Sequence, residues 1–261
     1  MDCLGRDGME TLATLFFLAI DTAVAALRDI TRLCLDPRSW RAIDRERRFV
    51  PFEERAWVTA LPLGLQLYRR IQRAKCDEHA SVPPLHWRGV QNIKDPFELA
   101  LYPLLLWELK PATIIELGSF RGGSALWLAD QMQAMGIDGH VYSFDIDPSR
   151  VIAQHTRVSF ERADCNDPST FPRARLEALP HPWLVIEDAH VNLPGVLGYF
   201  DELSHPGDYL AVEDLTSLRL YRQFRRFALE IRGRWLVDTH YTDRFGYNVT
   251  WNPNAYMKRV G

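Results

Sequence analysis

Residues 113–131 read TIIELGSFRGGSALWLADQ, and this stretch decides the fold. A short apolar run around Glu116 is followed by a turn with glycines at 118, 122 and 123 and then by a helical pattern. A strand, a glycine turn and a helix in this order are typical of the first βα unit of an open parallel sheet, which binds ligands beyond the carboxyl ends of its strands. We therefore expect a ligand site directly after this strand.

The rest of the chain after residue 95 continues the same alternation. Further apolar runs at 140–145, 157–164, 183–188 and 208–214 follow the first, and residues 96–110 form a helical pattern ended by Pro111. More helices are expected at 122–135, 149–155, 169–178, 194–204 and 216–231. This order predicts an α/β fold, a mostly parallel sheet covered by helices on both faces. The tail from residue 234 predicts an antiparallel hairpin at the edge of that sheet.

Composition excludes several classes of protein. The 261 residues carry a formal charge of -3 without a basic stripe, so no nucleic acid partner is expected. The four cysteines lie far apart, which disfavours a zinc site and disulfides and indicates a reducing, cytoplasmic location.

The apolar stretch at 11–35 is interrupted by charges, so we expect a helix and no membrane span. This helix would pack on the main domain or on another subunit, with attachment to a membrane surface as the alternative. Residues 1–90 are accordingly interpreted as a helical extension for oligomerisation or as a lid, and residues 91–261 as the ligand-binding domain.

The glycine turn predicts the kind of cofactor. Asp145 ends the second apolar run about 20 residues after the last glycine, where a carboxylate binds ribose hydroxyls. A dinucleotide fingerprint would need glycine at position 120, which is Phe120, and Glu116 would repel a phosphate but could accept from an amino group. S-adenosyl-L-methionine, with its nucleoside, ammonium and carboxylate groups, fits this pattern. The alternative is that the glycines only make a tight turn.

A second feature is a pair of strands that each stop on Glu-Asp, in VIEDAH (185–190) and AVEDL (211–215). Asp188, Glu213 and Asp214 would converge at one edge of the sheet, where their mutual repulsion calls for a hard cation such as Mg²⁺. An ion there would acidify and hold a hydroxyl for O-methylation, with Asp188 or His190 as the proton acceptor. Two alternatives remain: His190 only orients Asp188, and Asp214 only caps the helix expected at 216–231.

These residues resemble a known family. The stretches KDPFELALYPLLLWELKPATIIELGSFRGGSALWLAD, YSFDID, VIEDAH and SHPGDYLAVED are similar to the cephalosporin hydroxylase/rhamnosyl O-methyltransferase family of class I S-adenosylmethionine-dependent methyltransferases. The resemblance begins near Trp87 and covers roughly two-thirds of the chain. Phe120 departs from the most general methyltransferase loop, which often has a glycine there.

The resemblance implies a Rossmann-like methyltransferase fold in residues 91–261 and magnesium held by Asp188, Glu213 and Asp214. It implies a homo-oligomer and a small-molecule acceptor, a hydroxyl of a sugar or another natural product such as an antibiotic. The alternative is a related enzyme with non-methylating chemistry, such as a hydroxylase component or a rearrangement catalyst. The implied cofactor contacts are Glu116, Gly118, Ser119, Phe120, Gly122, Ser124, Asp145, Ile146, Asp164, Cys165 and Asp188.

Overall fold

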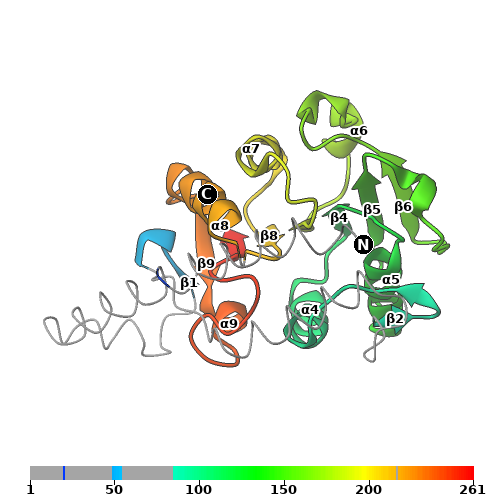
Figure 1. The fold of residues 1–261 in the computed structure, drawn as a ribbon, viewed down its shortest axis with the longest axis horizontal. Helices are drawn as coiled ribbons and strands as arrows, with labels where there is room; N and C mark the ends of the chain where they lie inside the picture. Colours follow the sequence, from blue (N-terminus) through cyan, green and yellow to red (C-terminus); the bar gives the residue numbers. More distant parts are fainter. Residues whose placement is uncertain (1–19, 21–48, 55–84, 216) are drawn as a thin grey trace, which may run out of the picture.

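The computed structural model describes residues 20, 49–54, 85–215 and 217–261 (Figure 1). These residues build an eight-stranded sheet in the order β1-β9-β10-β8-β7-β4-β5-β6 and a small hairpin of β2 and β3. Five neighbouring strands are parallel: β6 (Val158–Arg162), β5 (His140–Asp145), β4 (Thr113–Leu117), β7 (Trp183–Glu187) and β8 (Tyr209–Val212). The antiparallel strands are β10 (Tyr256–Arg259), β9 (Trp235–Asp238) and β1 (Phe49–Val50). The predicted parallel sheet with an antiparallel C-terminal edge is confirmed.

Helices cover both faces of this sheet (Figure 1). On one side lie α4 (Pro96–Leu109), α5 (Gly123–Ala134) and the short α9 (Thr239–Thr242). On the other side lie α6 (Arg173–Leu176), α7 (Leu193–Leu203) and α8 (Leu218–Glu230). The central strands β4, β7 and β8 are buried at every residue because both faces of the sheet are covered: Ile114 belongs to the core under α4 and α5, and Ile115 to the core under α7 and α8.

The start of α4 is specified locally by its sequence. The Asp95 side chain accepts from the Glu98 backbone N–H at 2.7 Å, and the Glu98 side chain accepts from the Asp95 N–H at 2.9 Å. This capping box satisfies free N–H groups of the first turn, and Pro96 suits a position where no N–H donor is needed. The segment just before α4 is thereby held against the carboxyl edge of the sheet.

Two expected helices are wrong. Between β5 and β6 the chain makes only a 3₁₀ turn at Pro148–Arg150, because the N–H groups of Ile152 and Ala153 donate to the Arg121 carbonyl instead of to a helix. Between β6 and β7 it makes a 3₁₀ turn at Pro168–Thr170 and the four-residue α6, since Pro172 interrupts the pattern.

Two described stretches before the boundary expected at residue 90 pack on the main sheet and its helices. β1 pairs with β9 in the main sheet, and Val50 and Phe52 lie in its core. The hairpin of β2 (His86–Trp87) and β3 (Val90–Gln91) packs on α5, where the Trp87 indole N–H donates to Asp130 at 2.7 Å. The helix expected within 11–35 lies outside the described residues apart from Ile20. The sequence also indicates a helix over 52–75, of which only Phe52–Glu54, a 3₁₀ turn, is described. In the part of the chain that is described, none of the helices has the length and apolar composition needed to cross a membrane.

Candidate active site

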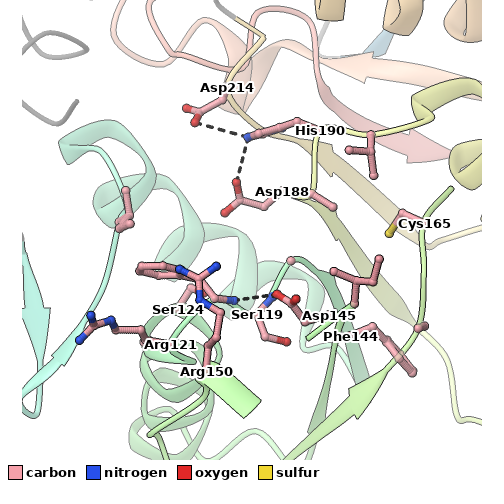
Figure 2. Close-up of a pocket in the computed structure, with 18 of the residues that line it drawn as sticks. Ser119, Arg121, Ser124, Phe144, Asp145, Arg150, Cys165, Asp188, His190 and Asp214 are labelled. Atoms are coloured by element: carbon pink, nitrogen blue, oxygen red, sulfur yellow. Dashed lines mark hydrogen bonds and ion pairs between the residues drawn. The ribbon is translucent and has the colours of Figure 1, made fainter. Parts of the chain in front are cut away.

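A cavity of about 840 Å³ opens at the carboxyl ends of the parallel strands (Figure 2). Its size is in the range of pockets that hold a cofactor together with a small substrate. Most of the residues predicted from the sequence line it: Gly118, Ser119, Phe120, Ser124, Asp145, Ile146, Asp164, Cys165, Asp188, His190 and Asp214. Glu116, Gly122 and Glu213 are not among its lining residues.

Gly118 brings the ends of β4 and β7 together. Its φ is +102°, and a Cβ atom there would lie 2.9 Å from the backbone carbon and oxygen of Asp188. Gly122 has a different role from the predicted cofactor contact. A Cβ on Gly122 would lie 2.7 Å from the Phe160 ring and 2.8 Å from the Ala153 Cβ, so this glycine allows close packing behind the cavity wall.

Asp145 holds the glycine turn in shape. One carboxylate oxygen accepts from the backbone N–H groups of Ser119 at 2.9 Å and Phe120 at 3.0 Å, and the other accepts from Asp147 N–H at 2.9 Å. Each oxygen can accept more than one hydrogen bond, and the side chain lines the cavity. Asp145 can therefore position the turn and still bind a ligand hydroxyl.

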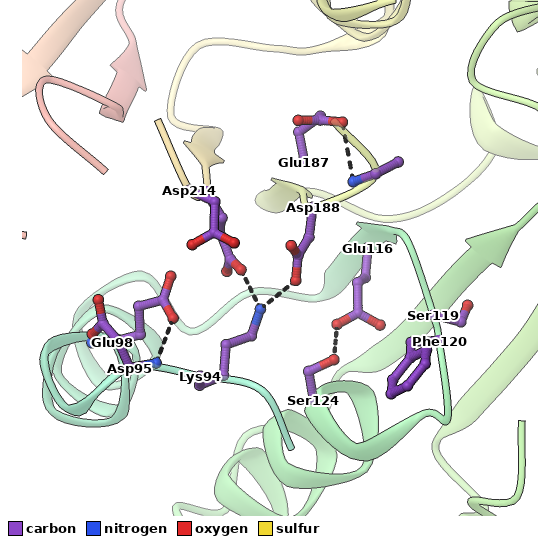
Figure 3. Close-up of polar contacts among 12 residues, drawn as sticks. Lys94, Asp95, Glu98, Glu116, Ser119, Phe120, Ser124, Glu187, Asp188 and Asp214 are labelled. Carbon is purple, nitrogen blue, oxygen red and sulfur yellow. Dashed lines mark hydrogen bonds and ion pairs between the residues drawn. The ribbon is translucent and has the colours of Figure 1, made fainter. Parts of the chain in front are cut away.

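Glu116 lies beneath the cavity (Figure 3). Its side chain is fully buried, its two oxygens accept from the hydroxyls of Ser124 and Ser143, and burial raises its pKa. The predicted direct contact between Glu116 and a cofactor amino group is not what this arrangement offers. Ser124, which lines the cavity and donates to Glu116, lies between that carboxylate and the cavity.

Asp188, His190 and Asp214 form one group on the opposite wall (Figure 2). The His190 Nε2 atom lies 3.2 Å from Asp188 Oδ1 and 3.5 Å from Asp214 Oδ2, and one ligand atom from each residue falls within 4.8 Å of the others. Burial alone would lower the pKa of His190, but the carboxylates of Asp188, Asp214 and Glu187 raise it well above its ordinary value. A cation, here the imidazolium, thus balances two carboxylates.

Unusual backbone conformations make this group possible. His190 and Asp214 have φ values of 60° and 51°, in the left-handed region. Glu187 stabilises the first turn because its carboxylate accepts from the N–H groups of Ala189 and His190. Asp214 N–H donates to the Asn252 side chain, and the cap of α8 is Ser217, so the alternative in which Asp214 only caps that helix is excluded.

Glu213 does not line the cavity but lies next to Asp188, where both carboxylates contact Lys94, a residue that sequence reasoning missed. The Lys94 ammonium donates to Asp188 Oδ2 at 2.9 Å (Figure 3). It also donates to Glu213 Oε2, and the Tyr102 hydroxyl donates to Glu213 Oε1. Burial raises the pKa of Glu213. Although burial also acts to raise the pKa of Asp188, Lys94 and His190 lower it well below its ordinary value. The metal role of Glu213 stays a prediction.

Two arginines near the glycine turn were also missed. Arg121 and Arg150 line the cavity, with their guanidinium groups 5.8 Å and 4.8 Å from the centre of the Phe120 ring. In the sequence, only the place of Arg121 within the glycine turn indicates that it could line the cavity.

Nothing in the sequence around Lys94 indicates that this lysine is buried, because lysine side chains are usually solvated.

Comparison with known proteins adds the family. The sequence model of the "Rhamnosyl O-methyltransferase/CmcI" family matches residues 81–219, more than half of the chain. The chain belongs to this family. The rhamnosyl O-methyltransferase of Mycobacterium leprae (strain TN) is 31% identical over 193 residues, which cover 66% of this chain and 82% of that protein.

Solved structures of CmcI, from which the family takes part of its name, are also similar. One with Mg and SAM is 33% identical, with a TM-score of 0.61 over 70% of this chain and 79% of that one. An apo-structure of CmcI is 31% identical, with a TM-score of 0.60 over 73% of this chain and 84% of that one. The rhamnosyl O-methyltransferase/CmcI membership confirms the resemblance, the Rossmann-like methyltransferase fold and the expectation of an O-methyltransferase enzyme.

Proposed function

We propose that this protein transfers a methyl group from S-adenosyl-L-methionine to a hydroxyl of a sugar or another natural product, with Mg²⁺ as the second cofactor. The observation that carries this proposal is the single cavity that joins the glycine turn to the Asp188, His190 and Asp214 group. A methyl donor on the turn and an acceptor hydroxyl at that group would then face each other. Relatives named for O-methylation and for Mg and SAM support the same function.

The residues around the turn suit the cofactor. Asp145 would accept from the ribose hydroxyls, and Ser119 and Phe120, whose N–H groups Asp145 already binds, keep the turn open to the ligand. Asp164, Cys165 and Ile146 line the adjacent wall, where they would contact the nucleoside. Ser124 and the acidic far wall would meet the ammonium group, with Glu116 acting through Ser124. S-adenosyl-L-methionine supplies an electrophilic methyl group when bound.

The donor set on the far wall suits a hard divalent cation. Asp188 and Asp214 offer carboxylate oxygens, the ligands that Mg²⁺ prefers, and Glu213 is the predicted third acid. When bound there, Mg²⁺ makes a neighbouring hydroxyl more acidic and holds its oxygen in place. His190 lies within reach of both carboxylates. With Mg²⁺ held by these carboxylates, His190 would no longer be needed as their counter-cation and could be neutral, so that its imidazole or the Asp188 carboxylate would accept the hydroxyl proton.

Methyl transfer is tested with purified full-length protein, methyl-labelled S-adenosyl-L-methionine and a panel of hydroxylated sugars and aromatic natural products. We expect label in an acceptor when Mg²⁺ is present and a loss of transfer after exhaustive chelation, restored by added Mg²⁺. Full transfer in chelated enzyme would remove the metal from the proposal. Cofactor binding without labelled product for any acceptor, together with a changed acceptor mass, would favour the alternative of non-methylating chemistry.

Residues 1–90 are proposed to contribute to a homo-oligomer. This part of the proposal rests on the apolar sequence at 11–35. Sedimentation of the full-length protein tests it, because a monomeric mass at micromolar concentration would exclude it.

A further inference from the structure

Lys94 is the buried cation behind the Asp188, His190 and Asp214 group. Its side chain is fully buried in the segment that leads into α4, and only two carboxylates receive its hydrogen bonds in the described part of the chain. These are Asp188, at 2.9 Å, and Glu213. Burying the lysine ammonium costs desolvation energy, and losing either contact would leave a buried charge without a partner. The two carboxylates are therefore held in place by Lys94.

In each of the two carboxylates, one oxygen accepts from Lys94 and the other oxygen has a different partner. Asp188 turns Oδ2 to Lys94 and Oδ1 to His190, 3.2 Å away at the cavity. Glu213 turns Oε2 to Lys94 and Oε1 to the Tyr102 hydroxyl. An ammonium group beside one oxygen repels a second cation from that oxygen. Asp188 therefore has only Oδ1 to offer an ion, and Glu213 has only Oε1, which also accepts from Tyr102.

The number of available oxygens bears on which divalent ion fits. Mg²⁺ takes six ligands in nearly octahedral geometry and keeps several waters, so carboxylates that give one oxygen each suit it. Ca²⁺ takes six to eight oxygens and accepts carboxylates that give both. A carboxylate held by one oxygen cannot turn to become bidentate without breaking its bond to Lys94.

We propose that Lys94 is a positioning residue that sets the ion preference of this site, by holding Asp188 and Glu213 to one available oxygen each and so favouring Mg²⁺ over Ca²⁺. This inference rests on the proposed function for the presence of an ion. Lys94 does not itself line the cavity and acts through Asp188 and Glu213.

Calorimetric titration of the full-length protein with Mg²⁺ and with Ca²⁺ tests the inference. Lys94→Met removes both hydrogen bonds, Lys94→Gln keeps a neutral amide donor without the charge, and Lys110→Met is the control at an exposed lysine. We expect the ratio of the Ca²⁺ to the Mg²⁺ dissociation constant to fall by about tenfold in Lys94→Met, the scale found when partners of metal ligands are removed. Thermal melting shows which variants are folded. If Lys94→Met is unfolded, the ratio of the two dissociation constants measured for Lys94→Gln decides the test.

Equal changes of both affinities, with the ratio kept, would overturn the inference, because a general effect of charge or of folding acts on both ions alike. The same holds if the control changes the ratio as much as Lys94→Met. A parent protein that binds neither ion would overturn the metal part of the proposed function as well. If the parent protein binds Mg²⁺ but the ratio of the two dissociation constants is the same in the Lys94 variants, the Lys94 inference fails while the metal part of the proposed function stands.

Discussion

Asp214 shows how one residue can be committed to a site by its backbone. Its φ of 51° is unfavourable for most side chains, with a cost of roughly 1 kcal/mol or more, although aspartate tolerates it better than others. The turned backbone directs the carboxylate toward His190 instead of toward the free N–H groups of α8, which Ser217 caps. Asp214 therefore contributes to the cavity at some cost to local conformation.

Removal of this carboxylate is expected to abolish chemistry while leaving the cofactor in place. In Asp214→Ala we expect methyl transfer to fall by at least about 100-fold, because an oxygen ligand of the proposed ion is lost. The affinity for S-adenosyl-L-methionine should change little, since Asp145 and the turn lie on the opposite wall (Figure 2). Calorimetry and a labelled-methyl assay measure the two effects. The control is Asp138→Ala, at a fully exposed carboxylate, and comparable activity in both variants would contradict the role of Asp214.

Two glycines with the same backbone angle separate conformational strain from steric contact. Gly118 and Gly207 have φ values of +102° and +103°, but a Cβ would meet the Asp188 backbone only at Gly118, and open space surrounds Gly207. We expect Gly207→Ala to lower the free energy of unfolding by about 1 kcal/mol. Gly118→Ala should lower it by a further ~1–3 kcal/mol and weaken cofactor binding, since β4 and β7 must move apart. Urea unfolding of both variants measures this, and equal losses would exclude the contact.

Among the elements, the start of α4 links local sequence to the site. Its capping box contains two buried carboxyl groups: Asp95, which directly follows Lys94, and Glu98, about one turn further along. Burial, with the carboxylate of Asp214 nearby, raises the pKa of Asp95 to about 6, and burial also raises the pKa of Glu98. In the unfolded chain the pKa of an aspartate is about 4. The folded state therefore binds more protons than the unfolded chain between these values.

From this difference follows a pH dependence of stability. Because the folded state holds the extra proton, the free energy of unfolding should decrease as pH rises from about 4 to about 6, by at most ~3 kcal/mol from Asp95. Asp95→Asn keeps an N-cap acceptor but cannot ionise, so this decrease should become smaller. Urea unfolding across this pH range measures it. Asp167→Asn, at an exposed 3₁₀ cap, is the control, and an unchanged pH profile in Asp95→Asn would contradict the assignment.

For the molecule as a whole, the cavity is where distant parts of the chain meet. The glycine turn after β4, the end of β5, the turn after β7 and the end of β8 all contribute to its lining. A ligand that fills it would connect these segments in the folded state only. Binding should therefore stabilise the entire fold and not one element.

This stabilisation is measurable without an acceptor substrate. At a cofactor concentration about 100 times its dissociation constant, linkage adds about 2.7 kcal/mol to the free energy of unfolding. For a chain of this size, that corresponds to a rise in Tm of about 5–10 °C. Scanning calorimetry with S-adenosyl-L-methionine, and with NAD as the control nucleotide, tests it. A rise with NAD alone would contradict the expected cofactor.

The sequence by itself determined the α/β alternation, the five parallel strands and the chemical character of the cavity. Apolar runs that end in Gly118, Asp145 and Asp188 are local signals, and the carboxyl ends of parallel strands necessarily meet at one edge. The same local signals failed at 149–155, because the Arg121 carbonyl takes the hydrogen bonds that a helix would need.

Only the tertiary structure decided the partners of the buried charges. The sequence predicted Glu116 and Glu213 as ligands, and the structure adds the partners of their oxygens: Ser124 and Ser143 for Glu116, and Lys94 and Tyr102 for Glu213. Lys94 precedes Glu213 by 119 residues, and no periodicity within either segment relates the two. Which carboxylate faces the cavity and which faces the protein depends on burial, and burial is a property of the packed molecule.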